Sequence, residues 1–178
     1  MHIEPGVVTG AKLLLGHATA AASLGAALLL SAKAVKKDGV AALALRTVVA
    51  SFLVFCFFEV LPHQPVGVSE VHLILGSTLL LLFGPAAAAL GLAGGLLAQG
   101  VFFAPADLPQ FGMNVTTLLV PLFATALLAR RIVAPHTPYV DLRYRDVLRL
   151  SLAYQGGVVS WVAFWALYGQ GLGADNLT

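Results

Sequence analysis

The sequence predicts an all-α membrane protein, a polytopic bundle of about six transmembrane helices that forms a single transmembrane domain over residues 1–178. Hydrophobic residues make up 59% of the chain and charged residues only 10%, whereas a soluble domain has about 25% charged residues. The mean hydropathy is +0.91. No polar stretch is long enough for a separate soluble domain, and a formal net charge of +2 gives no indication of nucleic-acid binding.

Apolar runs separated by Gly, Pro and charged residues mark the expected helices. The run from Val71 to Phe103 is too long for one helix, and Phe83-Gly84-Pro85 predicts a break inside it. The expected spans are therefore, in order, Val7 or Leu13 to Ser31, Val40 to Leu61, Val71 to the break, Ala86 to Phe103, Asn114 to Ala129, and Val147 to Tyr168. Six spans leave both ends of the chain on one side of the membrane.

The distribution of basic residues predicts that the amino terminus lies outside. With that orientation every cation except Lys12 lies at or near the inner face, as the positive-inside rule requires. Those inner cations are Lys33, Lys36, Lys37, Arg46, Arg130, Arg131, Arg143, Arg145 and Arg149. Glu4 and Pro5 precede the first apolar run and the basic residues follow it, which is the reverse of a cleavable signal, so we expect this helix to be retained.

The first residues of the chain predict a metal site. The free α-amine of Met1, the amide nitrogen of His2 and the His2 imidazole can close two fused chelate rings around one divalent ion, and His72 can supply a fourth nitrogen. Such a nitrogen set suits Ni(II) or Cu(II). The alternatives are an exposed His2 in a frayed terminus and a His72 that forms an interhelical hydrogen bond. We favour the ligand roles, since the apolar stretch from Ile3 to Val8 can fold residues 1–8 into the bundle and an ionisable side chain at membrane depth is usually functional.

Four polar residues are candidates for supporting such ligands, because a metal-bound imidazole usually donates its other N–H to a carboxylate or carbonyl. They are Asn114, Glu59, Glu70 and His17. Asn114 can either cap the fifth helix or hydrogen-bond to the buried terminus. Glu70, two residues before His72, points to another face if this segment is helical. His17 is either an interhelical packing residue or a relay deep in the first span, and His63 is expected in an outer loop.

Small residues recur every four positions on two of the expected helices. Ala18, Ala22 and Ala26 form one stripe, and Gly91 and Gly95 form the other, so that neighbouring backbones can approach closely. The alanine stripe is either an internal packing face or a docking face for another membrane subunit.

No motif for ATP binding or for hydrolytic catalysis is present. The chain lacks Gly-x-x-x-x-Gly-Lys-[Ser/Thr], His-Glu-x-x-His and Gly-x-Ser-x-Gly. This favours a binding and translocating protein that is not an enzyme and has no ATPase of its own. Two other classes stay open, namely a free-standing metal channel or secondary transporter, and an intramembrane enzyme that uses His72 with Ser69 or Ser77.

Several motifs resemble the CbiM/NikM family, the substrate-binding membrane components of cobalt and nickel energy-coupling factor transporters. The resemblance is carried by Met1-His2-Ile3-x-x-Gly6, by Ser69-x-x-His72 followed by Phe83-Gly84-Pro85, and by Gly112-Met113-Asn114. It implies that the amino terminus folds back into the bundle, and that Met1, His2 and His72 hold Ni(II) or Co(II) as the transported ion.

The resemblance also implies partners and a location. It implies a transmembrane coupling subunit, ATP-binding subunits that supply the energy, a small accessory membrane subunit, and the inner (plasma) membrane of a prokaryote. Members of the family tend to have a seventh, carboxy-terminal span that is missing here. In similar transporters an alanine-rich face of the substrate component docks onto the coupling subunit.

Overall fold

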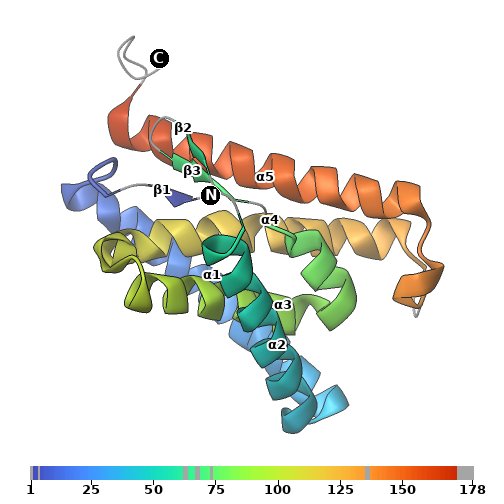
Figure 1. Ribbon diagram of the computed structural model, residues 1–178. Coiled ribbons are helices and arrows are strands. Elements are labelled where there is room, and N and C mark those ends of the chain that lie inside the picture. The colour runs from blue at the N-terminus through green and yellow to red at the C-terminus, as the bar shows by residue number, and fades with distance from the viewer. Residues whose placement is uncertain are drawn as a thin grey trace.

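The computed structural model describes residues 2–3, 5–61, 64–66, 69–72, 74–134 and 137–171. Five helices form the bundle: α1 (Leu13–Asp38), α2 (Val40–Glu59), α3 (Gly76–Phe102), α4 (Phe111–Ile132) and α5 (Tyr144–Gln170) (Figure 1). Short 3₁₀ helices lie at Gly10–Lys12, Pro105–Gln110 and Tyr139–Asp141. Within the described residues, five helical segments are long and apolar enough to cross a membrane. The predicted fold class, an all-α bundle of membrane-spanning helices, is therefore confirmed.

The six separate spans that the sequence predicted are not what the structure gives. The expected third and fourth helices are two parts of α3, which bends at Gly84, where φ is +80° and ψ is 168°. The first part, residues 76–83, rises only about 12 Å at 1.5 Å per residue and cannot cross a bilayer. The break at Gly84-Pro85 was predicted correctly, because a positive φ favours glycine and proline fits the first turn of a new helix. Residues 172–178 lie outside the described chain, so a seventh span is not tested.

Helix α2 and the second part of α3 run parallel, although they follow each other in the chain. A Cβ on Gly91 would meet Ala50, and a Cβ on Gly95 would meet Val54. Moving four residues forward along α3 therefore also moves four residues forward along α2, as in parallel helices. Between them the chain must therefore lead back towards the start of α2, and residues 76–83 are the last part of that path. The start of α1 and the end of α5 lie together, with Lys12 Nζ donating to the Gly169 carbonyl at 2.9 Å.

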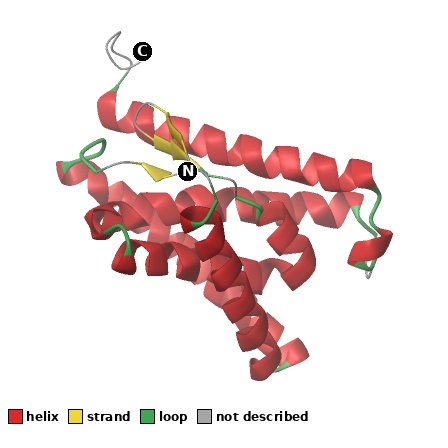
Figure 2. Ribbon diagram, viewed as in Figure 1, coloured by secondary structure: helices red, strands yellow, loops and turns green. Residues whose placement is uncertain are grey.

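A three-stranded antiparallel sheet, which the sequence did not predict, lies against the bundle beside α5 (Figure 2). Its strands are β1 (His2–Ile3), β2 (Gln64–Val66) and β3 (Ser69–Val71), in the order β1-β3-β2. Repeated valines between α2 and α3 favour strands over helix. Pro65 lies in β2, an edge strand, where a missing N–H costs no ladder hydrogen bond. The prediction that a helix begins at Val71 is therefore wrong.

The inward face of α1 is not the alanine stripe that the sequence singled out. The buried residues of α1 are Gly16, Ala20, Ser23, Ala27 and Ser31. Ala18 and Ala22 are exposed and Ala26 is half-buried. Of the two interpretations of the stripe, internal packing is therefore wrong for Ala18 and Ala22, which leaves this face available to lipid or to another protein. The glycine stripe on α3 does pack internally, against α2.

The cations gather at one end of the bundle. They lie at the end of α1, the start of α2, the end of α4 and the start of α5, whereas Lys12 lies at the opposite end with β1. Helix α1 runs past the predicted end at Ser31 to Asp38 and stops where Gly39 adopts a φ of +86°. The segregation of charge thus agrees with the sequence analysis, and the orientation in a membrane stays a prediction.

Candidate functional site

Three apolar residues near the start of the chain, Ile3, Val7 and Val8, are buried in the bundle. Ile3 and Val8 are fully buried, and they form a cluster with Met113 of α4 and Trp165 of α5. The backbone of Val7 passes so close to Gly169 that a Cβ there would meet the Val7 carbonyl oxygen. Ile3, Val7 and Val8 therefore hold this stretch of the chain against α4 and α5, while the predicted metal-binding role of residues 1–8 stays a prediction.

Asn114 fixes the backbone of the residue that follows His2. Its Oδ1 accepts a hydrogen bond from the Ile3 N–H at 2.6 Å, and its Nδ2 donates to the Ile3 carbonyl at 3.4 Å. The Asn114 side chain is buried and makes no cap, since α4 begins at Phe111. Of the two uses predicted for Asn114, the structure shows the hydrogen bond to the buried terminus. The Asn114 amide thus pairs with both backbone polar groups of Ile3, as the backbone of a neighbouring strand would.

Strand pairing brings the first residues next to the segment that carries His72. In the ladder between β1 and β3, His2 lies opposite Glu70 and Ile3 lies opposite Ser69. His72 follows β3 directly and is only 4% exposed. Its ring packs edge-on against Phe58 at the end of α2, with ring centroids 5.2 Å apart. Residues 66 and 68 positions apart in sequence are therefore neighbours in the fold.

His72 lies between β3 and α3, not inside a helix as the sequence analysis expected. The helical argument that turned Glu70 away from His72 is therefore wrong, because residues 69–71 form a strand. Extended backbone within a membrane bundle is tolerated where protein surrounds it, and in transporters such segments commonly form binding sites.

Helix α5 holds the residues after His72 in place. Gln155 Nε2 donates to the Ile74 carbonyl at 2.6 Å, and Gly76 lies against the ring of Tyr154. One turn further on, the Ser77 and Ser151 hydroxyls are 3.0 Å apart. Sequence analysis missed Gln155, although an amide in an otherwise apolar helix is a signal for a partner inside the bundle.

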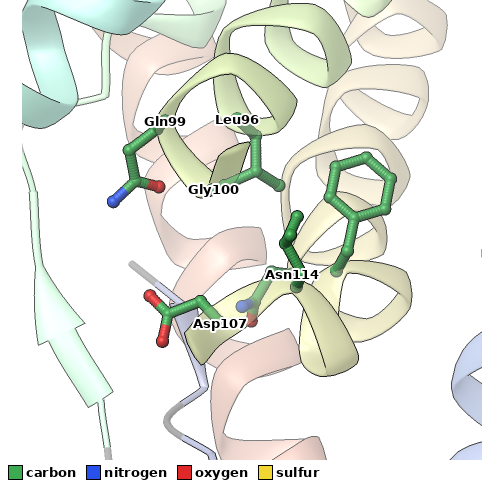
Figure 3. Close-up of a pocket in the computed structure, with 7 residues that line it drawn as sticks. Leu96, Gln99, Gly100, Asp107 and Asn114 are labelled. Atoms are coloured by element: carbon green, nitrogen blue, oxygen red, sulfur yellow. The ribbon is translucent and has the colours of Figure 1, made fainter. Parts of the chain in front are cut away.

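A small cavity of about 10 Å³ lies beside Asn114. This is about the smallest space that can hold one water molecule. Gln99 at the end of α3 and Asp107 in the following 3₁₀ helix line it, and Figure 3 shows their polar ends on the same side of the cavity. Polar groups thus continue from Asn114 towards the loop that joins α3 and α4.

The other predicted site residues have different outcomes. Met1, His63 and the side chains of His2 and Glu70 lie outside what the structure describes. Glu59 is half-buried at the end of α2. His17 is exposed and only one turn into α1, so the prediction that it lies deep in a span is wrong. Among the described residues, no three His, Cys, Asp or Glu side chains are grouped closely enough to hold a metal.

The fold and the site together define a class of protein, a polytopic membrane bundle whose amino terminus packs inside it beside a buried histidine. The chain belongs to the CbiM family, described as the cobalt uptake substrate-specific transmembrane region, and the match covers residues 2–175. Comparisons with curated proteins and with solved structures gave no match. The protein is therefore a multi-pass membrane component for the uptake of cobalt.

Proposed function

We propose that this chain is the substrate-binding membrane component of an energy-coupling factor importer for Co(II) or Ni(II). The ion is captured from outside and passed inward when separate subunits hydrolyse ATP. The observation that carries this proposal is the pairing of β1 with β3, which brings His2 to the strand that leads into His72. Membership of a cobalt uptake family supports the choice of ion.

In this proposal the ligands are the Met1 α-amine, the His2 amide and imidazole, and the His72 imidazole. Four nitrogen donors suit Ni(II), and imidazole binds divalent transition ions in general, including Co(II). The support comes from neighbouring contacts, since Asn114 fixes the Ile3 peptide and Phe58 packs on the His72 ring. Such contacts reduce the freedom of the ligands before the ion arrives, so less entropy is lost on binding.

Glu70 is the carboxylate that we assign to the support of these ligands. Its backbone lies directly opposite His2 in the strand ladder, and directly opposed residues have Cβ atoms about 4.5–5.5 Å apart. Glu59, at the end of the helix that carries Phe58, is a second carboxylate on the same side of the bundle. We assign no ligand role to His17, because it is exposed on α1.

The energy for transport comes, in this proposal, from partner subunits. The alanine face of α1, formed by the exposed Ala18 and Ala22 and the half-buried Ala26, is the surface that we assign to the transmembrane coupling subunit. Small side chains allow two helices to approach closely in a bilayer. ATP-binding subunits, a small accessory membrane subunit and a prokaryotic cell membrane complete the assembly that we propose.

His72→Ala is expected to weaken binding of Co(II) and Ni(II) by about 100-fold or more, because losing even a supporting contact costs about 10- to 100-fold. Calorimetric titration of the purified chain, beginning at Met1, measures this change. The matched control is His136→Ala, which removes a histidine to which we assign no role. Equal affinity of the His72 variant and the unchanged protein would contradict the ligand assignment.

Asn114→Ala is expected to weaken metal binding by about 10- to 100-fold while leaving every ligand atom in place. The Ile3 N–H, now donated to Asn114, would be left buried without that partner, at a cost of about 1–3 kcal/mol. Thr117→Val is the control, since Thr117 is equally buried on α4 but donates to its own helix at the Met113 carbonyl. The same titration, with thermal unfolding alongside, separates loss of the site from loss of the fold.

A further inference from the structure

A cavity of about 700 Å³ opens at the end of the bundle opposite the sheet. Its walls come from the end of α1, the start of α2, the bend in α3 and the end of α4. The cations that line it are Lys33, Lys37, Arg46 and Arg130, and Asp38 is the carboxylate beside them. None of these residues belongs to the metal site described above.

Among the residues that the structure describes, only one of the four cations of this cavity is paired with a carboxylate. Asp38 is paired with Arg46 at 2.8 Å. Lys33, Lys37 and Arg130 have no carboxylate at ion-pair distance among the residues that the structure describes. Three uncompensated cations around one cavity favour an anionic occupant.

The bend in α3 adds further donors to the same cavity. The second part of α3 begins after Gly84, and Pro85, Ala86 and Ala87 of its first turn line the cavity. Pro85 has no N–H, but Ala86 and Ala87 each carry one, and the N–H groups at the start of a helix carry part of the positive end of its dipole. They strengthen the preference for an anion that the three side chains establish.

An apolar groove continues from this cationic end towards the middle of the bundle. A second cavity of about 360 Å³ shares Leu30, Lys33, Pro85 and Arg130 with the first. Its other lining residues are all apolar: Ala26, Leu29, Phe123, Ala126 and Leu127. They precede Lys33 on α1 and Arg130 on α4, so the groove extends about 10 Å below the cations along two helices, at 1.5 Å per residue.

We propose that this groove binds an anionic phospholipid of the surrounding bilayer, with the phosphate among Lys33, Lys37 and Arg130 and an acyl chain between α1 and α4. The groove and a phospholipid have the same arrangement of charged and apolar parts. The cations lie at the ends of the helices, where the headgroup would be, and the apolar wall lies deeper, where the acyl chain would be. A free phosphate would leave the apolar part unfilled, and so would an acidic protein segment. Basic sites between helices at a membrane surface are suited to anionic headgroups.

The test compares phosphatidylglycerol with phosphatidylcholine on the purified full chain in detergent. Native mass spectrometry measures how much of each lipid the protein retains, and thermal unfolding measures the stabilisation. We expect phosphatidylglycerol to bind more tightly, and Lys33→Gln and Arg130→Gln each to weaken it about fivefold, which corresponds to about 1 kcal/mol per cation. Arg145→Gln, an exposed cation of α5 outside the cavity, should leave the preference unchanged.

Three results would overturn the proposal. Equal retention of both lipids would show that the cations do not select an anionic lipid, and would favour an acidic segment of a partner protein as their ligand. Stabilisation by inorganic phosphate as large as that by phosphatidylglycerol would assign the cavity to a free anion. An unchanged preference in the Lys33→Gln, Arg130→Gln double variant would place the lipid elsewhere, provided that unfolding in phosphatidylcholine shows the variant to be folded.

Discussion

One residue added before Met1 is expected to weaken the binding of Co(II) and Ni(II) by at least about 100-fold. The addition turns the Met1 nitrogen into an amide and moves the free amine one residue further from His2, so the chelate of Met1 and His2 can no longer close in its proposed geometry. The added residue also has little room, because Ile3 is fully buried and its backbone is held by Asn114. Calorimetric titration of chains that begin at Met1 and of chains that begin one alanine earlier measures the effect.

The control for this experiment is the same alanine added after Thr178, which changes the length but not the amine. Proteolytic removal of a longer leader, so that Met1 becomes the first residue again, should restore the affinity. Both forms should unfold at similar temperatures, because strand pairing and the Ile3 cluster remain. If the extended and native chains bind the ion equally well, the terminal chelate is not the site.

Gly76→Ala is expected to destabilise the protein by about 1–3 kcal/mol or more, the usual cost of overpacking a core. A Cβ at this position would lie 2.2 Å from the Tyr154 ring, which is fully buried and cannot move aside without disturbing α4 and α5. Metal affinity should fall as well, because Gly76 begins the helix that follows the His72 segment. Thermal unfolding in detergent and metal titration together measure the two effects.

Gly156→Ala is the matched control for this substitution. Gly156 also lies in a helix, two residues from Tyr154, but a Cβ there meets no atom within 4 Å. Alanine is a better helix former than glycine by about 1 kcal/mol, so this variant should be as stable as the native chain or slightly more stable. If the Gly76→Ala variant unfolds at the same temperature as the Gly156→Ala control, α3 does not pack tightly on α5 at this position.

Most of the helical framework could be predicted from the sequence, because apolar runs and breaks are local signals. The bend at Gly84-Pro85 was found for the same reason, since the two residues favour the conformation seen there. The inward folding of the first residues was predicted from the apolar stretch after His2, and its burial is confirmed at Ile3 and Val8. The metal ligands themselves stay a prediction.

The surroundings of His72 could not be predicted, because they depend on contacts between distant parts of the chain. Valine-rich residues before His72 suit a helix in lipid and a strand in a sheet, and the choice depends on β1, a partner far away in sequence. Likewise, the contact of Gln155 with Ile74 arises only once α5 packs on α3. The exposure of His17 follows from which face of α1 meets α4, and a mostly apolar helix does not reveal that face.

The position of β1 determines when the proposed site can be completed during synthesis. Its strand partner, β3, is made after two full helices, and Asn114 follows later still. Val7 packs beside Gly169, near the end of α5. Ile3 and Val7 therefore reach their final places only after α5 has been made and inserted, so the site that we propose stays unfinished while most of this chain is synthesised.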